Sequence, residues 1–423
     1  MTAIITDMTF LILPEPDSWW RVNPQPRWTR LNPGRGEVGF LVVHGIGDQQ
    51  PGETLQAYGL PIARYAEARS ARGGAGVRTT AAGADAEVAV EFTDLTGAGT
   101  RWLIRESWWS GEIAPPRYPA IALWLCLVAP WMLLREATQW PVARGIPHAV
   151  RAVRWIPWIG FYALVGWYLW FFEFTLLALP IVHVLLVLSV LIGWLLRGRG
   201  VLRRIGGVVS RTVGDAYAYI QRDMDHQRIV DKVTADMHAL ARRVDVLVVV
   251  AHSQGAALVR EALTARPPPS QLRTVVALGA GVDKLSALRR QRAFLAGPVI
   301  WTVTAWSGLA AFTLTSSDGL RLGLVLGALL LAVVLVWRER RRPSPLEGLP
   351  GLGSSWTWNH VFATCDLVPD GIRRLPAGVA PVPVVNHRSW IRDHTSYMAN
   401  REQVVAGIYH IGVCLTQSIT ISE

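Results

Sequence analysis

The stretch from Val244 to Leu263 constrains the fold more than any other region of the chain. Its sequence, VDVLVVVAHSQGAALVREAL, holds an apolar run that stops at AHSQG (residues 251–255) and resumes with helical spacing. The run 246–250 has no polar alternation, which is typical of a strand buried on both faces of a parallel sheet. The small residues that follow favour a helix packed closely on that strand. The stretch therefore predicts strand, sharp turn and helix in an α/β fold.

Ser253 lies at the sharp turn of this stretch. A serine between small residues at such a junction has its hydroxyl pushed out of a strained turn at the helix N-terminus, where free N–H groups and the positive dipole end stabilise negative charge. The pattern is that of the nucleophile elbow G-x-S-x-G, except that Ala251 replaces the first glycine. On this motif alone, an ordinary tight turn is the alternative. We take Ser253 as the candidate nucleophile.

A second loop of the same kind precedes it in the chain. The apolar run Val38–Val43 leads into His44-Gly45-Ile46-Gly47, and a helix is expected from about Glu53 to Arg69. A glycine-flanked loop between strand and helix allows backbone N–H groups to point at a ligand oxygen, as an oxyanion hole requires. By itself the HGIG loop is weak evidence, because glycines also simply make turns.

Further strands and helices complete the predicted sheet. Strands are expected at 87–95, 101–109, 274–278, 356–364 and 381–386. An amphipathic helix is expected over 212–243, and a closing helix over 401–411. The residues predicted to form the buried stripe of the first helix are Val213, Ile220, Ile229, Val233, Met237 and Leu240.

The composition indicates membrane segments. Hydrophobic residues make up 51% of the 423 residues and the mean hydropathy is +0.27, which is high for a soluble enzyme. The net charge of +11 is almost all arginine. A GC-rich genome accounts for most of that bias, although a basic excess at a membrane surface also favours anionic lipids. Nucleic acid is not an expected partner, because the arginines do not alternate with aromatics along one polar stretch.

Long apolar runs predict where the chain crosses the membrane. Residues 155–196 are long enough for two crossings of a core about 30 Å thick, and 297–315 and 320–337 form a second hairpin. Strands on both sides of each block must join one sheet, so each block crosses an even number of times. The shorter segment 118–134, which contains Pro130, is then expected at the interface or as a re-entrant loop. Buried helices of a large soluble core are the alternative.

Charge predicts the orientation of these hairpins. Arginine clusters precede and follow each one, whereas the tips near Glu173 and Asp318 carry no positive cluster. By the positive-inside rule the remaining domain faces the cytoplasm. We expect this to be the cytoplasm of a bacterium, with the chain in its inner membrane.

The cysteines are odd in number and scattered, at Cys126, Cys365 and Cys414, so neither disulfides nor a metal site is expected. No cofactor is expected either.

The later polar motifs DLVP (residues 366–369) and DHTSY (residues 393–397) follow the elbow, so the chain order is Ser, Asp, His. With the HGIG loop and the AHSQG turn, they make the chain resemble the lipase and esterase branch of the α/β-hydrolase superfamily. Small bacterial lipases are similar in carrying both an HGIG loop and an alanine-first A-H-S-x-G elbow. The resemblance covers the soluble regions, a little over half of the chain, and not the two membrane blocks.

The resemblance implies a role for each motif residue. Ser253 would attack a carbonyl, His394 would accept and return the proton, and Asp366 would orient and stabilise the imidazolium. The N–H groups of Ile46 and Gln254 would bind the oxyanion. The residues expected to support the oxyanion loop are His44, Gly45 and Gly47.

Several other residues compete for these roles. Asp370 is the alternative acid, although it lies in a Pro-Asp-Gly turn that needs no catalytic explanation. We expect His252, His360 and His387 to be structural histidines, and Asp393 to form a turn. The alternative for His394 is that the DHTSY segment is a turn that caps the last helix.

These observations predict an α/β-hydrolase fold, a mostly parallel sheet flanked by helices, interrupted by two transmembrane insertions. The expected function is that of a membrane-embedded serine hydrolase of acyl esters, with lipid esters as the expected substrates and membrane lipids as partners. An inactive hydrolase-fold scaffold that binds proteins is the alternative, and transport is a weaker one. The expected order is a lead-in (1–36), a first hydrolase segment (37–117), a first membrane insertion (118–200), a second hydrolase segment (201–296), a second membrane insertion (297–337) and a third hydrolase segment (346–423).

Overall fold

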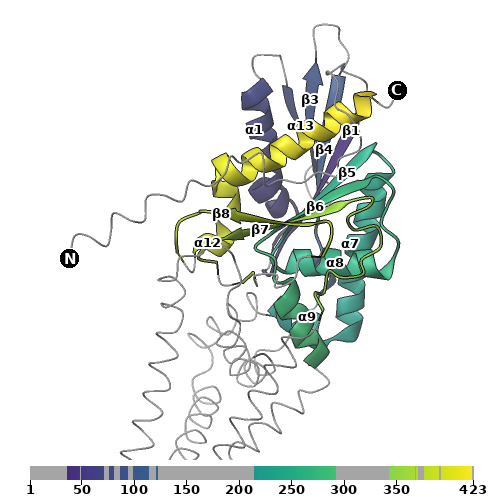
Figure 1. Cartoon of the computed structure of the whole chain (residues 1–423), viewed down its shortest axis with the longest axis vertical. Coiled ribbons are helices and arrows are strands. Elements are labelled where there is room, and N and C mark those ends of the chain that lie inside the picture. Colours follow the sequence, from purple (N-terminus) through teal and green to yellow (C-terminus); the bar gives the residue numbers. More distant parts are fainter. Residues whose placement is uncertain are drawn as a thin grey trace, which may run out of the picture.

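The computed structural model contains one eight-stranded sheet with the strand order β2-β3-β4-β1-β5-β6-β7-β8 (Figure 1). It describes residues 36–47, 49–70, 76–80, 86–93, 99–113, 121, 214–291, 343–366, 368–369, 376–389 and 392–421. The six parallel strands are β4 (Gly99–Ser107), β1 (Glu37–Val43), β5 (Val246–His252), β6 (Leu272–Leu278), β7 (Thr357–Ala363) and β8 (Val379–Val384). The mostly parallel α/β sheet predicted from the sequence is therefore confirmed.

Two further strands, β3 and β2, extend the sheet beyond β4 with antiparallel pairing. β3 (Glu87–Thr93) runs antiparallel to β4 and to β2 (Gly76–Thr80). β2 was not predicted, because its sequence GVRTT has no run of apolar residues. Its pairing to β3 is a tertiary feature that the local pattern does not encode.

The centre of the sheet brings the two candidate loops together. β1 pairs with β5 in parallel, with Val38 opposite Val246 and Val43 opposite Ala251. The two strands therefore end side by side, and the HGIG loop and the serine turn both leave from their carboxyl ends. In open α/β sheets this is the edge at which ligands bind.

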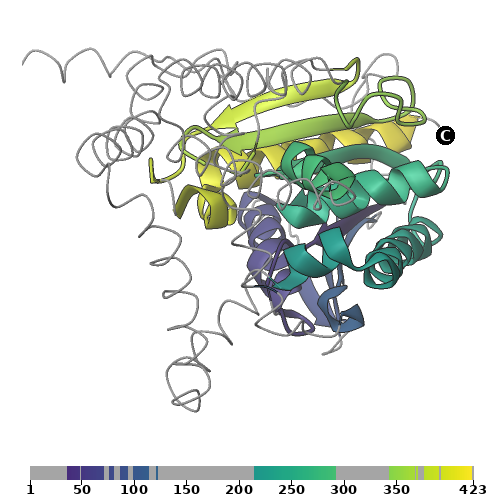
Figure 2. The same ribbon diagram turned by 90° about the horizontal axis from the view of Figure 1, so that it is seen from below.

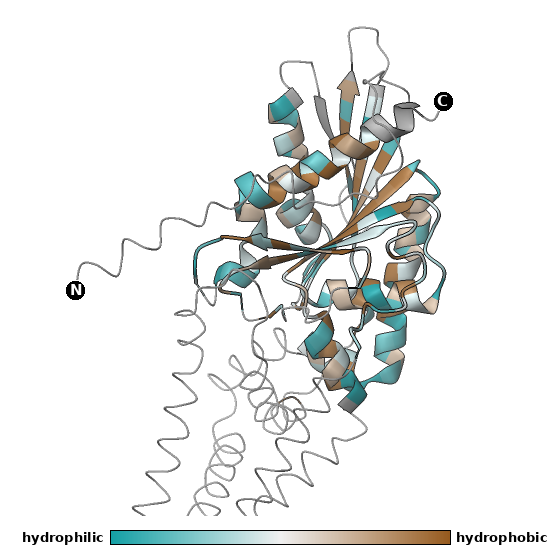
Figure 3. Cartoon of the chain, in the orientation of Figure 1, coloured by the Kyte–Doolittle hydropathy of each residue, from teal (hydrophilic) through white to brown (hydrophobic). Residues whose placement is uncertain are grey.

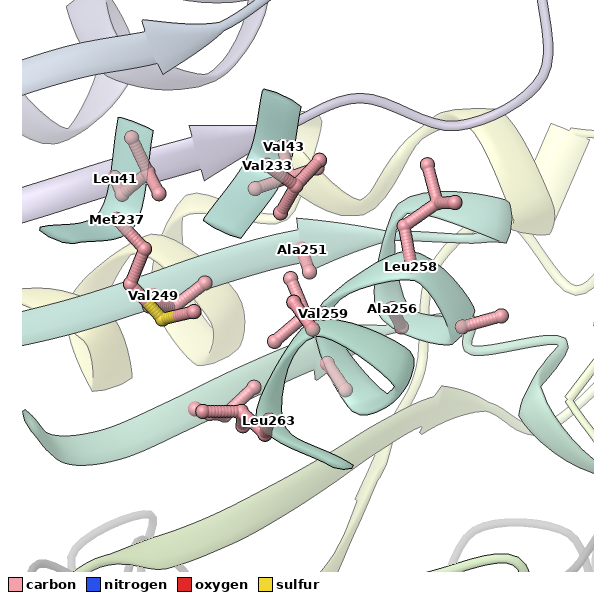
Figure 4. Close-up of a cluster of buried hydrophobic side chains, with 14 of the residues drawn as sticks. Leu41, Val43, Val233, Met237, Val249, Ala251, Ala256, Leu258, Val259 and Leu263 are labelled. Carbon is pink, nitrogen blue, oxygen red and sulfur yellow. The ribbon is translucent and has the colours of Figure 1, made fainter. Parts of the chain in front are cut away.

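Alternating strand residues feed two separate cores, as expected for strands buried on both faces. Val249 and Ala251 pack on the side of α7 (Asp223–Ala241), α8 (Gln254–Ala265) and α9 (Val282–Gln291) (Figure 4). Val248 and Val250 pack on the opposite side, toward α1 (Leu60–Ser70) and α13 (Ala406–Ile421). Figure 2 shows the helices on both sides of the sheet, and Figure 3 shows apolar residues concentrated in the strands.

The helices differ from the prediction by one internal break and at their ends. The expected helix 212–243 is broken at Arg222, whose extended backbone (φ −110°, ψ 102°) separates a helix at 214–221 from α7. Its predicted stripe is buried at every described position, and Val213 lies outside the described residues. The closing helix starts with the π-helical turn η7 (Arg401–Val405) and continues through α13 to Ile421. A similar turn, η3 (Leu55–Gly59), precedes α1.

The predicted membrane segments lie outside the described residues, apart from the buried residue Ile121. The same is true of the predicted lead-in, of which only Gly36 is described. Among the helices that the structure describes, none is long and apolar enough to cross a membrane.

Candidate active site

Ser253 occupies the sharp turn between β5 and α8. Its backbone has φ 53° and ψ −117°, a conformation that residues other than glycine rarely adopt. The turn is held by the Ser253 N–H, which donates to Leu278 O over 2.9 Å, and by Ser253 O, which accepts from Ala256 N at 3.3 Å. The strained turn presents the hydroxyl at the N-terminus of α8, as the sequence predicted for an elbow.

His394 links the serine to a carboxylate. Its Nε2 lies 2.9 Å from Ser253 Oγ, and its Nδ1 lies 2.9 Å from Asp366 Oδ2. Because an ionised carboxylate only accepts, Nδ1 carries the proton and Nε2 is free to accept the hydroxyl proton. The three residues come from the end of β5, the loop after β7 and the short helix α12 (Arg392–Thr395). The structure thus brings together the three residues that the sequence selected.

Asp366 is buried and fully hydrogen-bonded. Its Oδ1 accepts from Val368 N at 2.8 Å, and its Oδ2 accepts from Tyr397 Oη at 2.7 Å as well as from His394. Burial alone raises the pKa of this carboxyl, but these hydrogen bonds and the nearby imidazole outweigh it and lower the pKa below the usual value. Asp366 is therefore held as the anion that an imidazolium needs beside it.

Tyr397 is a site residue that the sequence reasoning missed. Its hydroxyl donates to Asp366 Oδ2 and accepts from Ala363 N at 2.9 Å, so it fixes the acid to the end of β7. The sequence feature that could have identified Tyr397 is its position three residues after His394 in the DHTSY motif. The alternative acid, Asp370, lies outside the described residues.

His252 packs against His394, the candidate base. Its Nε2 donates to His394 O over 2.8 Å, and the two rings are 4.8 Å apart. Burial, together with the neighbouring His394 ring, lowers the pKa of His252 to about 3, so it is neutral at neutral pH. His252 has the structural role that was predicted for it.

Asp393 organises the turn before His394. Its carboxylate accepts hydrogen bonds from the N–H groups of His387 at 2.9 Å, Ser389 at 3.1 Å and Cys365 at 3.3 Å. The last helix is capped instead by Asn400, which accepts from Gln403 N at 3.0 Å. The DHTSY segment therefore combines a turn-forming aspartate with a histidine that faces the serine.

His360, which the sequence predicted to be a structural histidine, is buried on β7, and its ring centroid lies 5.9 Å from that of Phe362.

The backbone requires glycine at both glycine positions of the HGIG loop. A Cβ on Gly45 would lie 2.8 Å from Ser253 Cβ, so only glycine lets the loop touch the elbow. Gly47 has φ +142°, which L side chains rarely adopt. Gly255 is equally restricted, because a Cβ there would lie 2.7 Å from Val43 O and closer still to His44 O.

His44 supports this loop from the core. Its Nδ1 donates to Gly45 O at 2.8 Å, and its ring stacks on Trp109 with centroids 4.4 Å apart and planes 8° from parallel. The indole N–H of Trp109 also donates to His44 O at 3.2 Å. Burial lowers the pKa of His44 to about 4, offset only partly by its bond to Gly45, so the ring is neutral.

The end of β4 and the residues that follow it hold the rest of the loop, up to Leu55. Glu106 is buried and accepts from the N–H groups of Gly52 and Leu55, the latter at 3.0 Å. Burial raises the pKa of this carboxyl, and the backbone donors offset only a fraction of that rise. Gln49 O accepts from Trp108 Nε1 at 2.6 Å and from Ser110 Oγ at 2.9 Å. The loop is thus fixed by side chains for which the sequence predicted no role at the site: Glu106 and Trp108 in the expected strand 101–109, and Ser110 just after it.

The two predicted oxyanion donors, Ile46 and Gln254, each follow directly after one of the two residues in the contact between Gly45 and Ser253. Ile46 follows Gly45, which packs on Ser253, and Gln254 is the first residue of α8. A helix has no internal acceptor for the N–H groups of its first turn, so the N–H of Gln254 suits an anion. In the portion of the chain that the structure describes, no group of His, Cys, Asp and Glu side chains could hold a metal ion.

Comparison with known proteins adds no assignment to this geometry: no known protein family and no curated protein matches the chain.

Proposed function

We propose that the chain is a serine hydrolase with an α/β-hydrolase fold that cleaves acyl esters through an acyl-enzyme. The observation that supports this most is the continuous path from Ser253 Oγ through His394 to Asp366, with 2.9 Å at each step. Separations in this range are those expected of an activated nucleophile, its base and the group that orients the base.

In this proposal the residues act in a fixed sequence. His394 Nε2 takes the hydroxyl proton as Ser253 Oγ bonds to the carbonyl carbon, and Asp366 stabilises the imidazolium. The N–H groups of Ile46 and Gln254 bind the oxyanion that forms. His394 returns the proton to the leaving alcohol as the ester bond breaks, and water then releases the acid by the same steps in reverse.

The choice of a lipid substrate rests on the sequence. Apolar segments at 155–196 and 297–337, flanked by arginines, favour an inner-membrane protein whose hydrolase domain faces the cytoplasm. A site anchored at a bilayer receives lipid esters without their crossing water. The triad itself does not distinguish esters from thioesters or amides, so the acyl ester is a choice made from this setting.

A fluorophosphonate probe applied to membranes that contain the full chain tests the reaction class. We expect wild-type protein to be labelled and Ser253→Ala to lose the label. Ser286→Ala is the matched control, because Ser286 is a buried serine on α9 that does not belong to the site. Equal labelling of Ser253→Ala and wild type would refute the proposal, and absent labelling of wild type would favour the scaffold alternative. Lipids that accumulate in a Ser253→Ala strain would indicate the substrate.

A further inference from the structure

We infer that Asp215 is a positioning residue that clamps the oxyanion loop to the nucleophile helix, an inference that rests on the proposed function. Asp215 lies in the helix at 214–221, 168 residues away in the chain from Gly47. Its Oδ2 accepts a hydrogen bond from Gly47 N at 2.9 Å. Nothing in the sequence pattern of this helix connects it with the HGIG loop.

The same residue also contacts the other half of the oxyanion hole. Asp215 O accepts from Gln254 Nε2 at 3.4 Å, and the Gln254 side chain is fully buried. Gln254 and the loop containing Gly47 are the two elements expected to supply oxyanion donors. Asp215 therefore joins the two elements whose spacing determines how well a tetrahedral intermediate is bound.

The clamp decides which loop N–H is available to substrate. Because the N–H of Gly47 is bound to a carboxylate, it does not serve an oxyanion, which favours the N–H of Ile46 as the donor from this loop. Gly47 has φ +142° and no side chain to restrict it, so an external bond is needed to fix its peptide. Donors that are fixed before the reaction cost no reorganisation in the transition state, which is the basis of oxyanion-hole catalysis.

The helix that carries Asp215 is itself fixed to α8. Tyr219, on the same helix as Asp215, donates from Oη to Glu261 Oε1 at 2.7 Å. His226, on α7, lies with Nε2 2.7 Å from the other oxygen of this carboxylate, Glu261 Oε2. Arg289 Nη1 donates to Tyr219 O at 2.7 Å. Glu261 belongs to α8, the helix that starts at the nucleophile. Asp215 thus transmits the position of the nucleophile helix to the oxyanion loop.

Two variants of the full chain in detergent test this role. Asp215→Ala removes the acceptor, whereas Asp215→Asn keeps an amide oxygen that can accept from Gly47 N. With p-nitrophenyl butyrate, we expect kcat of Asp215→Ala to fall about 10- to 100-fold with KM within about threefold, somewhat less than the loss of a donor itself. Asp215→Asn should stay within about threefold of wild type. Asp225→Ala is the control, since Asp225 lies on α7 and pairs with Arg222, at the break between the two helices, and with Arg228 on α7.

Hydrogen exchange of the backbone at residues 44–50 provides a readout that does not depend on activity. We expect faster exchange there in Asp215→Ala than in wild type, Asp215→Asn or Asp225→Ala. Unchanged kcat and unchanged exchange in Asp215→Ala would overturn the clamp, and so would an Asp215→Asn variant as impaired as Asp215→Ala. A wild-type protein that shows no esterase activity and no fluorophosphonate labelling would refute the proposed function, while the exchange result would still decide the clamp.

Discussion

His394 Nε2 lies 2.9 Å from Ser253 Oγ, although the two residues are 141 positions apart in the chain. The contact depends on parallel strands that end at one edge of the sheet, because Ser253 follows β5 and the loops that carry Asp366 and His394 follow β7 and β8. Each element of this arrangement has a consequence that can be measured.

Asp366→Asn should reduce kcat by about 10³- to 10⁴-fold, as expected when an orienting carboxylate is lost. An asparagine amide at this place can donate to Nδ1, which leaves the proton on Nε2, where it blocks proton transfer from Ser253. Ester hydrolysis and the rate of fluorophosphonate labelling are the measurements. A loss below about tenfold would point to another acid, and Asp370→Asn, measured in parallel, would identify whether it is Asp370.

Tyr397→Phe should impair both activity and stability, by different routes. Asp366 Oδ2 would lose its 2.7 Å hydrogen bond, so the carboxyl pKa should rise and the acid limb of the kcat profile should move to higher pH. The N–H of Ala363 would lose its buried acceptor, which costs about 1–3 kcal/mol of unfolding free energy. A pH profile of kcat and a thermal unfolding curve measure the two effects. An unshifted acid limb would show that Tyr397 acts only on stability.

The sequence predicted most of the strands, and it selected the three residues that the structure brings together, because each depends on local patterns. Apolar runs mark β1 and β5 as buried strands, and turn residues mark the positions of Ser253 and His394. Asp215 could not be predicted in the same way, since it belongs to no motif and its bond joins it to a residue 168 positions away. Tyr397 was marked only by its place in the DHTSY motif, and its bonds to Asp366 and Ala363 arise only in the fold. A hydroxyl or carboxylate in a helix has many ordinary explanations, and only the packed fold shows which partner it meets.

Gly255→Ala should abolish activity and destabilise the fold, whereas Gly281→Ala should be tolerated. The new Cβ at 255 would overlap the carbonyl oxygens of Val43 and His44, which are backbone atoms that cannot rotate away. Such overpacking costs about 1–3 kcal/mol or more. A Cβ at 281 would meet its nearest atoms at 3.5 Å or more, an ordinary contact distance. Soluble yield, unfolding temperature and labelling measure the difference, and equal behaviour of the two variants would contradict the packing described here.

Acidification from pH 7 to pH 5 should destabilise the protein, and His44 and His252 should contribute to the loss. Their folded pKa values, about 4 and about 3, lie below the ordinary value of 6.5. Between pH 6.5 and pH 4 the unfolded chain therefore binds protons that the folded chain does not, so the stability present above pH 6.5 falls as the pH drops. At about 1.4 kcal/mol per pH unit, each histidine accounts for about 2 kcal/mol at pH 5.

The variant His252→Gln separates the contribution of His252 to the acid-induced loss of stability from the contributions of all other groups. Glutamine keeps an N–H donor for His394 O but does not titrate, so the loss of stability between pH 7 and pH 5 should shrink by about 2 kcal/mol. Thermal or urea unfolding of the purified chain at the two pH values measures it. If His252→Gln shows the full wild-type loss on acidification, then His252 is not held neutral in the folded protein between pH 7 and pH 5.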